Sequence, residues 1–343
     1  MRTITGDRPE VVAAVKDQIN APLAGGYIGK RFFPGVTVRD PAGTFYHKSV
    51  DADADAASSR VATASIERAT ISNGTTAYSA GEVIKAYQIP EGDVKRYGTI
   101  DAADRIGITA ACRSVYRAHE TDAAAKIITT ARYNDGTYLT DGQVLKGLQT
   151  VALSVGRYYG RTVLAGSTTF FQNFVASTDV SAKIAALVGN GGITLDMLQM
   201  SLANDPQLAV SLLRTFLPFD EVLVGDDDFW AADGKTDAGI VARLPSAADI
   251  ADPVQFDLIM REAPVYGATA WYYPDGNEEG EFSARSYFDE DNDCNVYKAK
   301  GLYGLAEMNS GAVKLVKLNV FETTTTSTTT TTAAATTTTT AGG

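Results

Sequence analysis

The stretch DAADRIGITAACRSVYRAHETDAAAKIITTAR, residues 101–132, decides the fold class of this chain. Its apolar side chains recur at steps of three, four or seven residues, in the order Ile108, Ala111, Val115, Ala118, Ala125 and Ile128. This spacing predicts one long helix of ~48 Å at ~1.5 Å per residue. Because the stripe is narrow and rich in alanine, we expect the helix to pack closely on a β-sheet of the same chain.

The segment before this helix, Pro34 to Pro90, is rich in short β-prone runs and poor in large apolar residues. Polar stretches such as DADADAASS at Asp51 to Ser59 separate the runs. The runs are Val36–Val38, Thr44–His47, Ser65–Ile71 and Val83–Ile89. Such a segment buries too little apolar surface to be stable alone, so we expect an extended two-stranded excursion that lies on a neighbour.

The two ends of the chain differ from its body. Near the N-terminus, Val11, Val12 and Val15 have helical spacing within Arg8 to Ile19, and the loop-like APLAGG follows, which predicts an arm rather than a domain. Residues 323–343 consist of Thr, Ala, Ser and Gly alone, a composition that cannot form a core. We therefore expect a disordered tail there.

The chain after the long helix is first helical and then β-rich. A second amphipathic helix is predicted from residues at steps of three and four, namely Val144, Leu148, Val151, Val155 and Tyr158. Asp179 to Phe219 is a compact helical region, with helix starts expected at Thr194 and at Asp205-Pro206. A strand at Glu221–Val224 follows.

From Val254 onward the sequence favours strands. The strand signals are AWYY at 270–273, FSARSYF at 282–288, residues 295–298 and residues 313–321. Helices in the middle of the chain and strands at both ends indicate the mixed α+β class.

The overall composition excludes several classes of protein. The charges sum to 30 − 41 = −11 over 343 residues, which disfavours tight binding to polyphosphate backbones. No run approaches the ~20 apolar residues that span a bilayer, and the first residues do not predict a secretory signal. Cys112 and Cys294 are the only cysteines, so no disulfide framework is expected, and a reducing compartment is the simpler assumption.

Acidic clusters are the first candidates for metal ligands. Two of them begin like a calcium loop, but each lacks the glycine at position six and the glutamate at position twelve: Asp51, Asp53 and Asp55, and Asp289, Asp291 and Asp293. The third cluster, Asp226 to Asp228, directly follows the strand that ends near Val224, where a loop is the simpler interpretation. We expect no metal site at any of the three.

The remaining chemical motifs are equally incomplete. Gly234-Lys235-Thr236 resembles the end of a phosphate-binding loop, but Phe229 occupies the place of its first glycine. His47 and His119 are the only histidines, and neither has a second ligand at metal-binding spacing, so structural roles are expected. No nucleophile elbow is present. The sequence therefore names no catalytic, cofactor-binding or metal-binding residue, and we expect a structural protein rather than an enzyme.

The order of these features resembles the major capsid proteins of tailed bacteriophages, whose fold is named for phage Hong Kong 97. The resemblance is carried by FFPGVTVRDPAGTFYHK (32–48), by KAYQIPEGD (85–93) leading into the long helix, by ITLDMLQMSLANDPQLAVSLLRTF (193–216) with DEVLVGDDDF (220–229), and by KAKGLYGLAEMNSGAVKLVKLNVF (298–321). It covers roughly residues 25 to 322.

The resemblance implies a domain map and a function. Residues 1–33 would be the N-terminal arm, 34–92 the extended β loop, 93–160 with 255–322 the peripheral domain with its spine helix, and 161–254 the axial domain. The chain would form pentamers and hexamers of an icosahedral head around double-stranded DNA. Its partners would be further copies of itself, with scaffolding, portal and decoration proteins, and it would be made in the host cytoplasm and reside in the virion.

Three other hypotheses stay open. The same fold would suit the shell of a nanocompartment that encloses a cargo enzyme. A surface or adhesive protein with a Thr-rich stalk is a second alternative, and the missing signal argues against it. A carboxylate-dependent hydrolase is a third alternative, for which no site can be named.

Overall fold

The computed structural model describes residues 27–50, 73–94, 96, 100–188, 210–211, 213–215, 217–272 and 283–318. Its helices are α2 (Gly29–Phe32), α3 (Glu91–Val94), α4 (Ile100–Ile127), α5 (Thr130–Asn134), α6 (Val144–Ser154), α7 (Thr168–Ala176), α8 (Thr178–Val188), α11 (Asp227–Trp230) and α12 (Pro253–Glu262). Its strands are β1 (Gly35–Val38), β2 (Ala42–His47), β3 (Gly74–Ser79), β4 (Gly81–Pro90), β5 (Thr137–Leu139), β6 (Arg161–Ser167), β7 (Glu221–Gly225), β8 (Ala238–Leu244), β9 (Gly267–Tyr272), β10 (Ser283–Asp289), β11 (Cys294–Glu307) and β12 (Val313–Leu318).

The long helix predicted over 101–132 is α4, with 28 residues. Its predicted end is wrong by five residues, because the hydroxyl of Thr129 accepts a hydrogen bond from the backbone N–H of Arg132 and thereby begins the separate helix α5. Within α4, Ile108, Ala111 and Val115 are fully buried as predicted. Ala125 is exposed instead, because the buried face rotates along the helix onto Ala123, Ala124 and Ile127.

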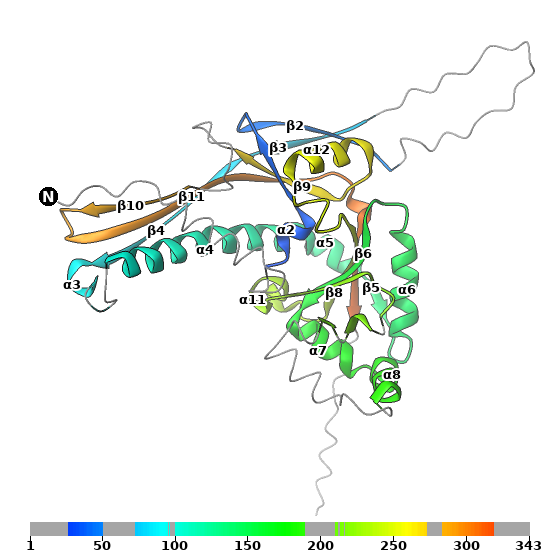
Figure 1. Ribbon diagram of the computed structural model, residues 1–343. Coiled ribbons are helices and arrows are strands. Elements are labelled where there is room, and N and C mark those ends of the chain that lie inside the picture. The colour runs from blue at the N-terminus through cyan, green and yellow to red at the C-terminus, as the bar shows by residue number, and fades with distance from the viewer. Residues whose placement is uncertain are drawn as a thin grey trace, which may run out of the picture.

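One face of α4 packs on a β-ribbon made by β10, β11 and β4, as predicted for a sheet of the same chain (Figure 1). Strands β10 and β4 flank the first half of β11 in antiparallel pairing, and β9 pairs with its second half, from Tyr303↔Trp271 to Glu307↔Gly267. Parallel β1 extends the sheet beyond β9. Ile108 and Val115 meet Tyr297 and Ala299 of β11 in one apolar cluster.

A second five-stranded sheet has the order β5-β12-β8-β6-β7. Its strands are largely buried, and together with α6, α7 and α8 they form the main core, which contains Phe170, Phe171 and Phe174 of α7. The predicted residues of α6 are all buried in this core. Strands β5 and β12 belong to this sheet, although their residues fall in the ranges 93–160 and 255–322 expected for a peripheral domain.

The region after Val254 was expected to be β-rich, and this expectation is wrong at its start. Residues 253–262 form α12, because the carboxylate of Asp252 accepts the backbone N–H of Val254, Pro253 occupies the first turn, and Phe256 and Met260 bury one face. The strands predicted further on are present as β9, β10, β11 and β12.

Several expectations lie outside the described residues. They are the N-terminal helix at 8–19, the strand at 65–71, the helix starts at Thr194 and Asp205-Pro206, and the tail at 323–343. The assignment of ranges to arm, loop, peripheral and axial domains stays a prediction. In the part of the chain that the structure describes, no helix is long and apolar enough to cross a membrane.

Candidate assembly surfaces

The edge of the ribbon is unusually open. Strand β4 has ten residues, of which Ile89 alone is buried, and among the described strands it pairs only with β11. An edge strand of this length leaves a row of backbone donors and acceptors free to pair with another chain. A strand that exposes both an edge and nearly all its side chains is suited to contact with a further subunit.

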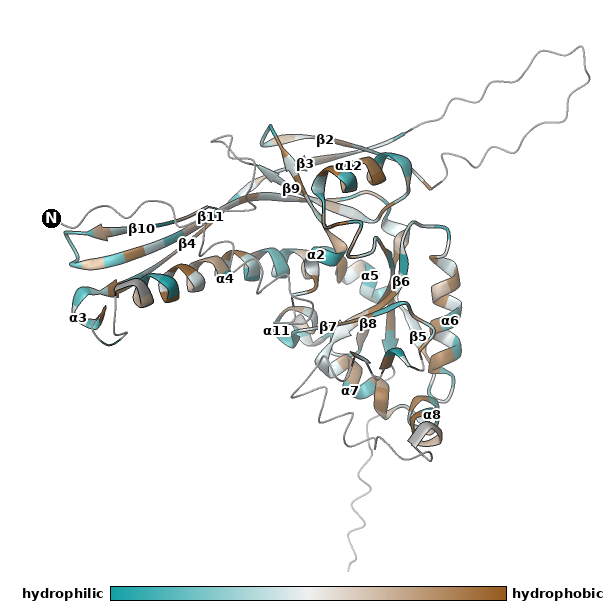
Figure 2. Ribbon diagram, in the orientation of Figure 1, coloured by the Kyte–Doolittle hydropathy of each residue, from teal (hydrophilic) through white to brown (hydrophobic). Residues whose placement is uncertain are grey.

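The two faces of the ribbon differ in character. Toward α4, the hydroxyl of Tyr297 donates to Oδ1 of Asp104 at 2.8 Å, and the hydroxyl of Tyr87 lies 2.7 Å from Oγ of Ser114. Because side chains alternate along a strand, residues one step away lie on the opposite face. That outer face combines apolar and basic side chains: Ile84, Tyr287, Arg285, Lys298 and Lys300, the last paired with Glu82. Apolar and polar residues also alternate along the ribbon in Figure 2.

The predicted two-stranded excursion has its stem in β2 and β3. Phe45 is buried against Phe256 and Met260, whereas Tyr46, which follows it, is 61% exposed. Nε2 of His47 lies 3.0 Å from Oγ1 of Thr76 across the stem, and burial lowers the pKa of His47. The stem therefore rests on α12 of its own chain, contrary to the expectation that the excursion lies on a neighbour, because Phe45 supplies an apolar anchor.

A buried carboxylate joins three parts of the chain. Glu120 of α4 is 1% exposed, and its Oε1 accepts the backbone N–H of Ile28 at 2.6 Å and the indole N–H of Trp230 at 2.6 Å. Its Oε2 accepts the N–H of Gly29 at 2.8 Å. Burial raises the pKa of Glu120 to about 7, and the three donors and Lys30 oppose that rise. We call this group the Glu120 joint.

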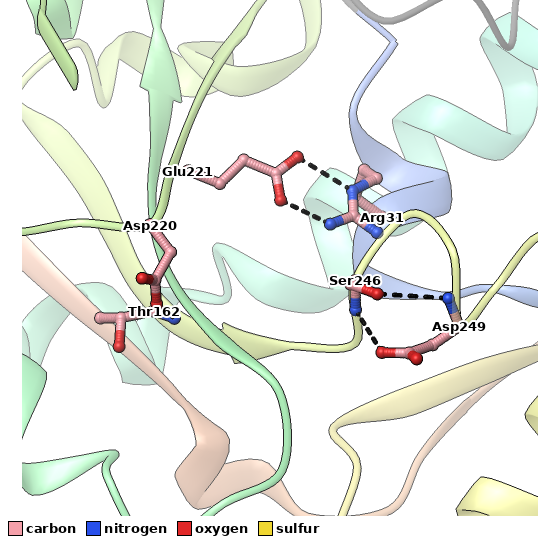
Figure 3. A network of polar contacts seen from close by, with 6 residues as sticks. All are labelled: Arg31, Thr162, Asp220, Glu221, Ser246 and Asp249. Atoms are coloured by element: carbon pink, nitrogen blue, oxygen red, sulfur yellow. Dashed lines mark hydrogen bonds and ion pairs between the residues drawn. The ribbon is translucent and has the colours of Figure 1, made fainter.

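An ion pair attaches the same N-terminal segment to the second sheet. Figure 3 shows the guanidinium of Arg31 facing the carboxylate of Glu221, with an Nη2–Oε2 distance of 2.6 Å and an Nε–Oε1 distance of 3.3 Å. The neighbouring Asp220 accepts the backbone N–H of Thr162 at 2.8 Å, which ties the entrance of β7 to β6. Residues 28–31 thus contact both the spine helix and the second sheet.

Both histidines have structural roles. His119 is buried, its ring stacks on Trp271 at 5.6 Å, and its Nε2 lies 2.9 Å from Oγ1 of Thr269. The Thr269 hydroxyl donates to the carbonyl of Phe33 at 2.8 Å, so its oxygen is left to accept the His119 N–H. This contact fastens the residue that follows α2 to the spine helix.

The acidic clusters serve as turns and helix caps. The carboxylate of Asp289 accepts the side-chain amide of Asn292 and the backbone N–H of Asp291, and these bonds hold the pKa of Asp289 below its usual value. Asp226 caps α11, and Asp227 accepts the N–H of Thr169. Asp51, Asp53 and Asp55 lie outside the described residues. Among the residues that are described, no three His, Cys, Asp or Glu side chains are placed to hold a metal ion.

The other motif residues are also structural. Nζ of Lys235 lies 3.3 Å from the carbonyl of Ile128 and 5.8 Å from the ring centroid of Tyr133. Cys112 and Cys294 are buried free thiols, as expected. Sequence reasoning missed Glu120, Arg31 and Trp230. An acidic residue four positions after Tyr116 and three before Ala123, on the buried face of a helix, was the available signal for Glu120.

The arrangement of a long helix under a β-ribbon, a projecting two-stranded stem and a separate five-stranded sheet is that of the Hong Kong 97-type fold. This is the fold of the major capsid proteins of tailed bacteriophages, and the present chain has it. No protein-family description matches the sequence, and no curated protein is significantly similar to it.

Solved structures similar to this chain come from phage-related sources. A phage-related protein from Bordetella bronchiseptica RB50 is 16% identical, with a TM-score of 0.59 over 92% of this chain and 98% of the other. The virus-like particle from Pyrococcus furiosus is 10% identical, with a TM-score of 0.48 over 90% and 98%. The capsid of cyanophage P-SCSP1u is 8% identical, with a TM-score of 0.49 over 86% and 88%.

Proposed function

We propose that this chain is the major capsid subunit of a tailed-phage head, assembling into pentamers and hexamers of an icosahedral shell around double-stranded DNA. The observation that carries the proposal is β4, an edge strand exposed along almost its whole length in a chain that otherwise buries two substantial cores. Such a surface becomes stable against aggregation when another copy covers it. The chain acts as a structural protein and not as an enzyme.

The other partners follow from this role. Further copies of the chain are the main partner, through contacts within and between capsomers. Scaffolding, portal and decoration proteins are additional partners, and the DNA is enclosed without sequence-specific binding. The net charge of −11 suits a wall that does not hold phosphates tightly during packaging. The subunit is made in the host cytoplasm and resides in the virion.

Negative-stain microscopy of the purified chain tests assembly directly. We expect uniform closed shells or hexameric rings, and a monomer at all concentrations would contradict the proposal. The content of the shells separates the head from a nanocompartment. Nuclease-protected double-stranded DNA in particles from infected or induced cells supports the head, whereas a co-purifying cargo enzyme without DNA supports the nanocompartment.

A deletion tests which surface drives assembly. Residues 51–72 connect β2 to β3 and can be replaced by a short Asn-Gly turn, since His47 and Gly74 are already paired at the end of the stem. Lys48 stays, because its N–H donates to the carbonyl of Met260. We expect the variant to fold with unchanged melting temperature but to form no shells. Removal of 323–343 is the matched control, and we expect that variant to fold and assemble.

A further inference from the structure

The Glu120 joint is a titratable group at the one place where the N-terminal segment, the spine helix and α11 meet. Two N–H donors reach Oε1, from Ile28 and Trp230, and one reaches Oε2, from Gly29. A Cβ at Gly29 would lie 2.7 Å from Oε2, so the backbone approaches the carboxylate as closely as a glycine permits. Movement of residues 28–29 or of Trp230 therefore changes the surroundings of this carboxylate.

This hydrogen-bond pattern accommodates a proton. In a carboxylic acid the carbonyl oxygen can accept two bonds and the hydroxyl oxygen one, which matches the two-plus-one arrangement if the proton resides on Oε2. The ionised form makes the same three bonds but places a negative charge in a site closed to water, at a cost in free energy. Both forms fit the joint, and they differ in the charge that the joint contains.

The surrounding charges do not neutralise the ionised form fully. The nearest cation is Lys30, whose ammonium group donates to the hydroxyl of Tyr116 at 3.1 Å. The charged and titratable groups around the joint come from all three elements: Tyr27, Lys30, Arg113, Tyr116, Arg117 and Asp226. Arg117 lies beside Asp228 at 3.4 Å, which offsets its charge. Burial accordingly outweighs these groups and places the pKa of Glu120 at about 7.

We propose that Glu120 is a proton-operated latch that ties residues 28–29 and Trp230 to the spine helix tightly when it carries a proton and loosens them when it is ionised. The attachment of the N-terminal segment would then respond to pH around neutrality. This inference concerns a single folded chain, so it can fail or succeed whether or not the chain assembles.

Trp230 is a built-in probe of the latch. The chain has two tryptophans, so a Trp271→Phe variant reports on Trp230 alone. We expect its fluorescence to change in one transition with a midpoint near pH 7 between pH 5 and pH 9. Glu120→Gln in the same background keeps a carbonyl oxygen for Ile28 and Trp230 but cannot ionise, and we expect the transition to disappear.

His119 provides the matched control, because it neighbours Glu120 in sequence and also titrates near neutrality in its ordinary state. His119→Gln in the Trp271→Phe background should keep the transition. A transition that persists in Glu120→Gln, or that disappears in His119→Gln, would overturn the proposal.

Amide hydrogen exchange tests the latch without substitution. A carboxyl group with a pKa near 7 is about 90% protonated at pH 6 and about 10% at pH 8. We therefore expect the protection factors of the Ile28 and Gly29 amides to fall by up to about tenfold over this range. The amide of Ile128, which donates to the carbonyl of Ala124 at the far end of α4, should keep its protection. Equal protection of Ile28 and Gly29 at both pH values would refute the latch.

Discussion

The ring of Tyr297 lies so close to the backbone of Gly107 that α4 has no room for a Cβ at this position. Gly107 is thus the point at which the spine helix approaches β11 most closely, and the hydrogen bond from Tyr297 to Asp104 fixes the ring there. A glycine within a helix ordinarily costs about 1 kcal/mol relative to alanine. Here the close packing of helix and ribbon requires it.

Gly107→Ala should therefore destabilise the protein, although alanine favours helices. We expect a loss of about 1–3 kcal/mol in the free energy of unfolding, because the ring of Tyr297 must move out of a packed cluster. Gly92→Ala in α3 is the control, since nothing lies within 4 Å of a Cβ at that site. Chemical denaturation measures both, and a stabilised Gly107→Ala would contradict the packing described.

Two substitutions to aspartate test which face of α4 is buried. Val115 is 0% exposed among apolar neighbours, so Val115→Asp should bury an unpaired charge and cost several kcal/mol, with loss of soluble protein. Ala125→Asp lies on the exposed face and should cost at most about 1 kcal/mol. Yield and melting temperature report the difference. Similar losses for both variants would place Ala125 inside the core, as the sequence pattern alone suggests.

The stability of the chain should depend on pH through Glu120. Its pKa is raised from 4.5 to about 7 in the folded state, so the folded protein binds more protons between these values. The stabilising contribution is therefore fully present below pH 4.5 and is lost as pH rises through 7, with an amplitude of about 3 kcal/mol. Denaturation of wild type and Glu120→Gln across this window measures it, and parallel curves for the two proteins would contradict the prediction.

Phe45 and Tyr46 are adjacent residues with opposite roles in the stem. Phe45→Ala removes the anchor on α12, so the amides of β2 and β3 should exchange faster while the main unfolding transition changes little. Tyr46→Ala removes an exposed ring and should leave the exchange of the isolated chain unchanged. If Phe45→Ala had no effect on these amides, another contact would have to hold the stem.

The sequence predicted elements whose pattern is local. The stripe of α4 and the stripe of α6 repeat at helical spacing, so each could be read without knowing its partner. By contrast, β8 (AGIVARL) is an interior strand of its sheet with six of its seven residues buried, and it shows no alternation of polar and apolar residues to mark it. The helix α12 was missed because only Phe256 and Met260 mark its buried face, although Asp252-Pro253 is a start signal of the kind expected at Asp205-Pro206.

The candidate surfaces were less predictable than the helices. Val83 to Ile89 could be identified as a strand, but its exposure depends on which strands pair with β11, a contact more than 200 residues away in sequence. The partners of Glu120 are likewise distant, with separations of 92 and 110 residues to Ile28 and Trp230. No local pattern encodes such contacts.

The position of β12 has a consequence for the synthesis of the chain. This strand, the last that the structure describes, lies between β5 and β8, and its partner residue to Val316 in β5 is Thr137. The second sheet cannot close until nearly all of the polypeptide has left the ribosome, and pairing over such a distance is slow. A chain released before Val313 would leave β5 and β8 with open edges and an unfinished core. Translation errors that shorten the chain thus produce molecules that cannot reach the native state, which keeps incomplete copies out of the pool of mature protein.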